Sequence, residues 1–359
     1  MEKSDKVYVA GHRGLVGSAI VRCLQQAGYE NLLLRSRSEL DLTDKNAVAA
    51  FFAEQQPDYV FLAAARVGGI YANATRPAEF IYDNLMIQCN VLRAAAESRV
   101  QKLIFLGSSC IYPRLAPQPM REEYLLSGPL EPTNSAYAVA KIAGIEMCRA
   151  FNRQYETNFV PVMPTNLYGP FDNYDLLSSH ALPALMRKFH LAKLAAAGDR
   201  AALAKDVQVY GPLPDDFYAN LQRIAAFYGQ RLHDSDTVPQ PPAGEVSDAV
   251  VLWGTGQPLR EFLFVDDLAE ALLFVMRNCQ STELLNIGTG VDLTIRALAE
   301  IVRDVVGYAG GFAFDAAKPD GMPKKLLDVS RLKGLGWRPR FTLEEGIRVA
   351  YASYLQGVV

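Results

Sequence analysis

The strongest constraint on the fold of this chain is its opening, in which a strand, a glycine-rich turn and a helix follow one another directly. Residues 7–10 are apolar, the turn reads GHRGLVG over 11–17, and a helical pattern runs on to Ala27. Glycines let a backbone approach a pyrophosphate, and a helix N-terminus presents N–H donors to it. The alternative is an ordinary glycine-rich turn, because the GxxGxxG spacing differs from GxGxxG. The pattern predicts a dinucleotide-binding loop, with contacts expected from Gly11, His12, Arg13, Gly14, Leu15, Val16 and Gly17.

Strand patterns and helix patterns alternate through the first half of the chain. Strands are expected at 7–10, 31–34, 59–65, 102–107 and 159–163, and helices at 17–27, 44–55, 85–97 and 137–155. Pro161 places the last strand at a sheet edge or a bulge. This alternation predicts an α/β fold with a doubly wound, mostly parallel sheet.

The second half is less regular and predicts a smaller α/β part. Strands are expected at 250–253, 262–265 and 284–287, and helices at 187–197, 266–278 and, capped by Thr294, up to 306. Within 198–249, Asp215 and Asp216 are expected to cap a helix ending near Leu232, and 239–242 to form a loop. We assign 1–170 to a dinucleotide-binding domain, to which the chain can return later. Residues 171–359 are assigned to a substrate-binding part with a helical insertion at about 198–249.

Composition narrows the class of protein. The chain has 359 residues, half of them hydrophobic, which is enough for one large domain or two linked ones. The net charge is −3 and no basic cluster occurs, so nucleic acid is not an expected partner. No apolar run is long enough for a membrane span, and no signal peptide is recognisable. The five cysteines show no CxxC and no metal-ligand spacing, so we expect reduced thiols, no metal site and a cytoplasmic location.

The end of the second expected strand indicates which dinucleotide is bound. NAD-binding proteins usually place an acid there for the ribose 2′-hydroxyl. This chain reads Leu34-Arg-Ser-Arg37-Ser, with no acid before Glu39. Arginine favours a 2′-phosphate through charge-assisted hydrogen bonds. The sequence therefore predicts NADP(H), with Arg37 as a contact, unless these arginines are ordinary solvated surface charges.

A tyrosine and a lysine four residues apart form the candidate catalytic pair. Tyr137 and Lys141 begin a long expected helix and would share one of its faces. A tyrosine has a reference pKa of about 10, and a neighbouring ammonium lowers it toward neutrality. The preceding strand ends in Leu106-Gly-Ser108-Ser-Cys110, so a serine hydroxyl can join the phenol on a carbonyl oxygen. The alternative is a surface tyrosine and lysine beside a polar loop.

Several motifs together resemble one enzyme family. They are GHRGLVGSAI (11–20), AARVGGIYAN (64–73), LGSSCIYP (106–113), EPTNSAYAVAKIAG (131–144), MPTNLYGP (163–170), WGTGQPLREFLFVDD (253–267), NIGTGVD (286–292) and KPDGMPKKLLD (318–328). The chain resembles the extended short-chain dehydrogenase/reductases, and among them the GDP-L-fucose synthases. These are NADPH-dependent 3,5-epimerase/4-reductases that act on GDP-4-keto-6-deoxy-mannose.

The resemblance implies a two-stage reaction on a sugar with a ketone at C4. The ketone acidifies the hydrogens on C3 and C5, and Tyr137 and Ser108 can stabilise the enolate charge on O4. Inversion needs one group to remove a proton and another to return it on the opposite face, and the family pattern assigns Cys110 and His180. Hydride then reaches C4, Tyr137 protonates O4, and Lys141 tunes Tyr137.

The resemblance also implies the ligand contacts and a homodimer. Besides the glycine-rich turn and Arg37, the expected cofactor contacts are Leu106, Gly107, Ser108, Ser109, Lys141, Pro164, Thr165, Asn166, Leu167 and His180. The expected contacts to the GDP-sugar are Lys188, Trp253, Arg260 and Asp320. Positive charge suits a diphosphate. For Trp253 the alternative is core packing, and for Arg260 a surface salt bridge.

In the family pattern the helix near residue 195 and the strand near residue 250 are joined by a shorter segment. The insertion at about 198–249 departs from that pattern, so the resemblance does not decide which sugar the substrate carries. A related GDP-4-keto-deoxy sugar, of the colitose or deoxy-heptose type, is one alternative. A nucleotide-sugar 4,6-dehydratase would place an acidic pair where this chain has Cys110 and Ile111. A 4-epimerase holding NAD is disfavoured by the arginines at 35 and 37. A non-enzymatic NADP-sensing protein would not need the five catalytic candidates together.

Overall fold

The computed structural model describes residues 1–232, 247–318 and 320–357, and the chain forms two compact units. The first unit comprises Met1–Phe171, Glu261–Asp292 and Lys325–Leu343; the second comprises Asp172–Arg260, Leu293–Lys324 and Glu344–Val359. The chain therefore returns twice to the first unit. The sequence analysis assigned 171–359 to the substrate-binding part, while allowing the chain to return later to the first domain. The two returning segments pack in the first unit because one supplies a sheet strand and a covering helix.

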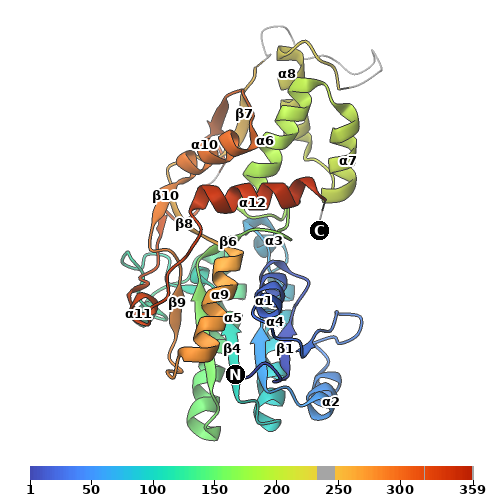
Figure 1. The fold of residues 1–359 in the computed structure, drawn as a ribbon. Helices are drawn as coiled ribbons and strands as arrows, with labels where there is room; N and C mark the ends of the chain where they lie inside the picture. Colours follow the sequence, from blue (N-terminus) through green and yellow to red (C-terminus); the bar gives the residue numbers. More distant parts are fainter. Residues whose placement is uncertain (233–246, 319, 358–359) are drawn as a thin grey trace. The chain divides into compact units, whose positions relative to one another are not determined.

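A six-stranded parallel sheet lies at the centre of the first unit (Figure 1), in the order β2-β1-β3-β4-β5-β9. Its strands are β1 (Val7–Ala10), β2 (Leu32–Leu33), β3 (Tyr59–Leu62), β4 (Lys102–Leu106), β5 (Phe159–Pro164) and β9 (Leu285–Ile287). Strand β2 lies on one side of β1, and the later strands β3, β4, β5 and β9 follow one another on the other side, so the strand order reverses between β1 and β3. Ligands bind at such a reversal, outside the carboxyl ends of the strands.

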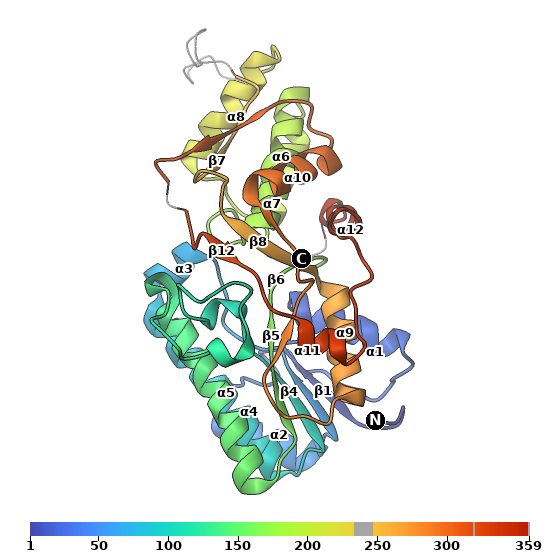
Figure 2. The same ribbon diagram turned by 90° about the vertical axis from the view of Figure 1, so that its left-hand side faces the viewer.

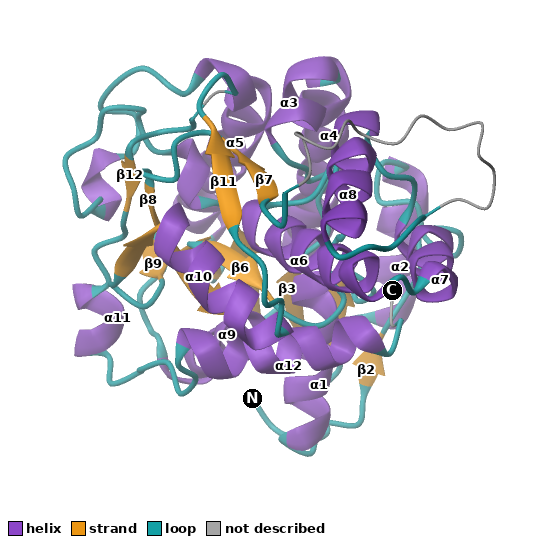
Figure 3. Cartoon of the chain, turned by 90° about the horizontal axis from the view of Figure 1, so that it is seen from above, coloured by secondary structure: helices purple, strands orange, loops and turns teal. Residues whose placement is uncertain are grey.

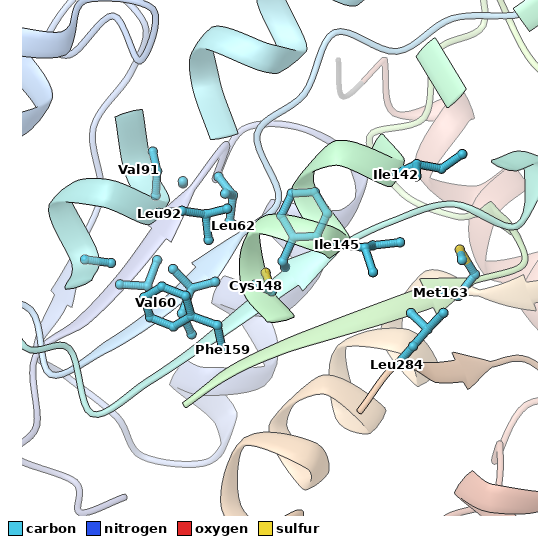
Figure 4. Packing of buried hydrophobic residues seen from close by; sticks show 14 of the residues in the cluster. Val60, Leu62, Val91, Leu92, Ile142, Ile145, Cys148, Phe159, Met163 and Leu284 are labelled. Atoms are coloured by element: carbon cyan, nitrogen blue, oxygen red, sulfur yellow. The ribbon is translucent and has the colours of Figure 1, made fainter. Parts of the chain in front are cut away.

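Helices cover both faces of this sheet (Figure 2). On one face α1 (Leu15–Gln26) packs with α9 (Val265–Asn278); on the other lie α2 (Lys45–Gln55), α4 (Pro77–Glu97) and α5 (Ser135–Tyr155). Figure 4 shows Val91 of α4, Ile145 of α5 and the strand residues Val60 and Phe159 as members of one hydrophobic core cluster. The predicted doubly wound α/β fold is confirmed.

Two details of the first unit differ from the sequence-based expectation. Pro161 lies inside β5, which is paired on both sides rather than being an edge strand. Pairing with β9 begins only at Val162, so the missing N–H of Pro161 removes no hydrogen bond on that side. Helix α4 begins at Pro77, eight residues earlier than expected, because proline is well suited to the first helical turn.

The shorter elements of the first unit complete it. They are α3 (Ile70–Thr75), β6 (Asn166–Tyr168), α11 (Ser330–Gly334) and three 3₁₀ turns at Ser109–Ile111, Glu122–Tyr124 and Pro132–Asn134. Strand β8 (Leu259–Phe264) begins in the second unit, and its last three residues pair in parallel with β6. Strands β10 (Asp292–Thr294) and β12 (Lys324–Lys325) lie at points where the chain passes from one unit to the other.

The second unit combines helices with a two-stranded parallel sheet (Figure 3). Its elements are α6 (Ala181–Ala197), α7 (Arg200–Tyr210), α8 (Asp215–Phe227), β7 (Val250–Trp253), α10 (Ile295–Val306), β11 (Phe312–Asp315) and α12 (Leu343–Leu355). Helix α8 begins with Asp215 and Asp216 in its first turn but ends at Phe227, earlier than expected. The loop expected at 239–242 lies outside the described residues. Thr294 caps α10 as predicted, accepting from the Ala297 amide at 3.1 Å.

A buried ion pair ties α7 into the core of the second unit. Arg187 of α6 is fully buried, and its Nε donates to Asp206 of α7 at 2.8 Å. Its other nitrogens donate to the carbonyls of Tyr174, Tyr210 and Gly211, so four of the five N–H donors of this buried charge are hydrogen-bonded to described residues. The segment after α6 is therefore part of a packed structure rather than a linker. Among the described residues, no helix has both the length and the apolar character to cross a membrane.

Candidate active site

The turn after β1 is built around two glycines that cannot carry a side chain. Gly11 has a φ of +82°, and a Cβ there would lie 2.8 Å from backbone atoms of Ala64. A Cβ on Gly17 would lie 2.0 Å from the carbonyl oxygen of Gly11. A Cβ on Gly14, by contrast, would meet only that oxygen, at 3.6 Å. Packing does not require Gly14, and its bare backbone gives a ligand close access to the start of α1.

Helix α1 presents unused hydrogen-bond donors at this turn. Gly14 is the N-cap, so no side chain caps the helix. Among the described residues, the amides of 15–17 have no acceptor, as expected for a first helical turn. The Nδ1 atom of His12 is buried and likewise has no partner in the described part of the chain. The amides of α1, together with the positive end of the helix dipole, fit a pyrophosphate.

The end of β2 offers a cation and no available carboxylate. Glu39 accepts from the hydroxyl of Ser36 at 2.6 Å and from its amide at 2.7 Å, and these bonds lower the pKa of Glu39. Arg35 lies over an aromatic ring of α2, 5.6 Å from its centroid. Arg37 is exposed, with Asp41 3.8 Å from its Nε. Glu39 closes its own turn, so the group best placed to meet a ribose substituent is the Arg37 guanidinium.

Tyr137 and Lys141 are buried one helical turn apart on α5. The Lys141 Nζ donates to the carbonyl of Leu106, at the end of β4, over 2.8 Å. It lies 6.0 Å from the centroid of the Tyr137 ring. The ring of Phe80 packs edge-on against Tyr137, with centroids 6.4 Å apart. Because both side chains are buried, the alternative of a surface tyrosine and lysine does not hold.

The ionisation of this pair differs from the sequence-based expectation. Burial raises the pKa of Tyr137 above its ordinary value of 10, Cys110 raises it further, and a hydrogen bond with Ser108 acts in the opposite direction. Burial lowers the pKa of Lys141 to about 8, against an opposing contribution from Cys110. We expected the ammonium to lower the pKa of the phenol, but burial raises it. Near neutral pH, Tyr137 is therefore a protonated hydrogen-bond donor.

The loop after β4 brings a hydroxyl and a thiol to the same place. The Ser108 Oγ lies 3.1 Å from the Cys110 Sγ. Ser108 also caps the 3₁₀ turn at 109–111 and hydrogen-bonds the Tyr137 hydroxyl. Ser109 is buried, whereas Cys110 is half-buried. The structure therefore places a hydroxyl, a phenol and a thiol together at the carboxyl end of β4.

Residues 164–167 lie at the carboxyl end of β5, between the carboxyl ends of the neighbouring strands β4 and β9. The Thr165 amide donates to the carbonyl of Ile287 at 3.0 Å. The Asn166 side chain donates to the carbonyl of Glu261 at 2.7 Å. These bonds fix the segment that runs from Pro164 at the end of β5 to Leu167 in β6.

The second unit holds the other candidates, three of them on or near α6. His180 is exposed at the N-cap of α6, and Lys188 lies two turns further along. The Lys188 ammonium lies 5.6 Å from the centroid of the Trp253 ring and donates to the carbonyl of Val251 at 3.4 Å. Half of the surface of Trp253 is exposed, so it is not the core residue that we considered as the alternative.

Arg260 and Asp320 also lie in the second unit. Burial lowers the pKa of Arg260, and the charge of Asp320 acts in the opposite direction. Both carboxylate oxygens of Asp320 accept from Thr255, from its amide at 2.9 Å and its hydroxyl at 2.6 Å. The Arg260 guanidinium is partly desolvated, and no salt bridge from it is found among the described residues, so the alternative of a surface salt bridge is not supported.

Comparison with known proteins identifies the family. The model for the NAD dependent epimerase/dehydratase family matches residues 7–214 and 195–288. The chain belongs to the NAD dependent epimerase/dehydratase family. The match is in two pieces that meet at 195–214, where the sequence analysis places the start of an insertion.

Relatives that match along their full length show which members of this family the chain is similar to. The chain is 48% identical to GDP-L-fucose synthase 1 of Arabidopsis thaliana, covering 99% of this chain and 95% of the relative. It is 47% identical to GDP-L-fucose synthase of Escherichia coli, covering 98% and 97%. A solved GDP-mannoheptose C4 reductase from Campylobacter jejuni with NADP bound is 37% identical, with a TM-score of 0.80 over 99% of both chains.

Sequence reasoning missed three buried residues that hold segments around the candidate site in place. Glu261 accepts from the amides of Gly290 and Leu327 at 2.7 and 3.0 Å. Asn286 accepts from the Tyr112 hydroxyl at 2.7 Å, beneath the Ser108 loop. Gln88 of α4 donates to the carbonyl of Ala140 at 2.6 Å, next to Lys141 of the candidate pair.

Some sequence signal for these residues was present. Glu261 lies in the stretch 253–267 and Asn286 in 286–292, both of which carried the family resemblance. Gly144, at the end of another such stretch, allows α5 to approach the ring of Phe105, because a Cβ there would lie 2.3 Å from it. What the sequence did not contain was the partner of each buried polar group, since the partners are remote along the chain.

Proposed function

We propose that this protein is an NADPH-dependent enzyme that epimerises C3 and C5 and reduces C4 of GDP-4-keto-6-deoxy-D-mannose, giving GDP-L-fucose. The observation that carries the proposal is the group of Tyr137, Lys141, Ser108 and Cys110 at the carboxyl end of β4. It occurs in a chain that resembles GDP-L-fucose synthases along its whole length.

The residues around the first turn fit NADP(H). Gly14 and the free amides of α1 would hold the pyrophosphate, and Arg37 the 2′-phosphate. Lys141 and the 164–167 segment would hold the nicotinamide ribose and ring. The bound cofactor supplies the hydride for C4.

Each catalytic candidate has a separate task in the proposed reaction. Tyr137 and Ser108 donate hydrogen bonds to O4, which stabilises the enolate during inversion. Cys110 and His180 remove and return protons at C3 and C5. Tyr137 then gives its proton to O4 during reduction, and its raised pKa keeps that proton in place at neutral pH. In the second unit, Lys188, Trp253, Arg260 and Asp320 would hold the GDP moiety.

A GDP-heptose C4 reductase is the second candidate, supported by the similarity to the Campylobacter jejuni enzyme. Incubating the protein with enzymatically made GDP-4-keto-6-deoxy-D-mannose and NADPH, followed by NMR of the product, separates the two. We expect GDP-L-fucose, with inversion at C3 and C5. A product reduced at C4 with both centres retained would overturn the epimerase half of the proposal, and no consumption of NADPH would overturn all of it.

We also infer a homodimer located in the cytoplasm, with no nucleic-acid or membrane partner. The inference is supported by the resemblance to the family and by five free cysteines, which suit a reducing compartment. The net charge of −3 without a basic cluster gives no electrostatic attraction for nucleic acid.

Binding of GDP is expected to weaken as the pH rises through about 8. Burial lowers the pKa of Lys188 to about 8 from its ordinary value of 10.5. Below that pH the ammonium attracts the diphosphate; above it the amine is neutral, so the Kd rises, by up to about tenfold per pH unit. Calorimetric titration with GDP from pH 7 to 9 measures this effect. In Lys188→Met the Kd should be higher throughout and lack this dependence, and parallel curves for the two proteins would contradict the assignment.

A further inference from the structure

We propose that helix α8 forms one wall of the nucleotide-sugar site, and that Phe217 holds the Lys188 ammonium in position for the diphosphate. This inference rests on the proposed function, because it takes Lys188 as a diphosphate ligand. It assigns a positioning role to the segment that departs from the family pattern. All the residues involved lie in the second unit.

Helix α8 is held rigidly against β7, the strand that ends at Trp253. Asn220 of α8 is buried, and its amide group pairs with the free edge of β7. Its Nδ2 donates to the carbonyl of Ala249, and its Oδ1 accepts from the Val251 amide, both at 3.0 Å. This side chain therefore makes the two hydrogen bonds that a neighbouring strand would make. Helix α8 also packs on α6, so it is fixed to both elements that carry the ligand candidates.

Phe217 places an aromatic face on the Lys188 ammonium. The Nζ lies 5.2 Å from the centroid of the Phe217 ring and 5.6 Å from that of Trp253. Among the described residues its one hydrogen-bond acceptor is the carbonyl of Val251, at 3.4 Å. An ammonium has three donors, so this cation is oriented by two rings while most of its hydrogen-bonding capacity is unused.

Aromatic rings suit this task better than a carboxylate would. Asp216 of α8 is near enough to raise the pKa of Lys188 against the effect of burial, but no ion pair between the two is found among the described residues. A carboxylate paired directly with Lys188 would neutralise the charge that a diphosphate needs, whereas a ring face stabilises the cation and leaves its charge available. A lysine side chain also loses considerable rotamer freedom when it binds a ligand. Holding the ammonium in advance reduces that loss, which is the usual advantage of preorganisation. Residues in α8 can thus influence how tightly a GDP-linked substrate is bound.

The test is a volume-conserving removal of the ring, Phe217→Met, with Phe227→Met as the matched control. Phe227 lies on the same helix, but half of its surface is exposed and its ring packs on Tyr228. We expect Phe217→Met to raise the Kd for GDP about 5- to 30-fold, the range for loss of a desolvated cation–π contact. The Kd for NADPH and the kcat should stay unchanged while the KM for the GDP-sugar rises. Phe227→Met should change none of these.

A double mutant decides whether Phe217 acts through Lys188. In a Lys188→Met background, Phe217→Met should change the Kd for GDP less than twofold, because the cation that it positions is gone. Equal effects of Phe217→Met in both backgrounds, or no effect on GDP binding in either, would overturn the proposal. The failure of the proposed function is separately visible, since the wild-type protein would then not bind GDP or would form a different product.

Discussion

Replacing Tyr137 with phenylalanine is expected to lower the rate of C4 reduction about 10²- to 10⁴-fold, the usual contribution of a general acid. The substitution removes only the hydroxyl, so the ring keeps its edge-on packing against Phe80. The proton that O4 must receive then has to come from water, which a buried site excludes. The hydroxyl is also the group that Ser108 contacts, so enolate formation should slow as well.

Single-turnover oxidation of NADPH, followed by its absorbance, measures this effect. The matched control is Tyr155→Phe, because Tyr155 lies at the other end of α5, and about half of its surface is exposed. The control should keep full activity, and both variants should bind NADPH as tightly as the wild type. A loss of less than tenfold in Tyr137→Phe would remove this residue from the proton-transfer step.

The fold was predictable because its signals are local. Short windows of sequence show the apolar strand at 7–10 and the glycines that follow it. They also show the alternation between strand-like and helix-like spacing of apolar residues. The structure adds a reason that the pattern alone did not contain. Gly11 and Gly17 are required by backbone contacts within the turn, whereas Gly14 is not. That difference separates the glycines that build the loop from the glycine that gives a ligand access.

The remaining features depend on contacts between distant residues. The pKa of Tyr137 rises instead of falling because the side chain is buried. The spacing of Tyr137 and Lys141 along a helix predicts that they share a face, but it does not predict how deeply that face is buried. Glu261 and the Gly290 amide that it accepts from are 29 residues apart in the sequence. Lys188 lies on α6, whereas the Phe217 ring that it contacts lies on α8. Such pairings arise from the way that elements pack, and not from the spacing of residues within any one element.

Replacing Cys110 with serine is expected to stop inversion at C3 and C5 while leaving reduction of C4 nearly intact. A hydroxyl is a far weaker base than a thiolate, so the variant loses about 10²- to 10⁴-fold in proton removal. Reduction uses Tyr137 and Lys141, which the substitution leaves in place. Serine is slightly smaller, so the contact with Ser108, now 3.1 Å from sulfur to oxygen, remains possible.

Deuterium uptake from D₂O at C3 and C5 measures proton removal directly and does not depend on the hydride step. The wild-type protein should incorporate deuterium at both carbons, and Cys110→Ser at neither on the same time scale. Cys89→Ser is the control, since Cys89 lies on α4 with its sulfur 3.6 Å from that of Met147, and it should behave as the wild type. Unchanged uptake in Cys110→Ser would show that another group is the base.

The second acid/base candidate makes the test more specific. If Cys110 removes the proton and His180 returns it on the opposite face, His180→Gln should still exchange deuterium, because removal and return by the thiol are intact. The exchanged centres should then keep their original configuration. Loss of uptake in Cys110→Ser with retention in His180→Gln would identify a two-base inversion, whereas the same loss in both variants would mean that neither residue acts independently. A C4 reductase without epimerase activity would take up no deuterium even as the wild type.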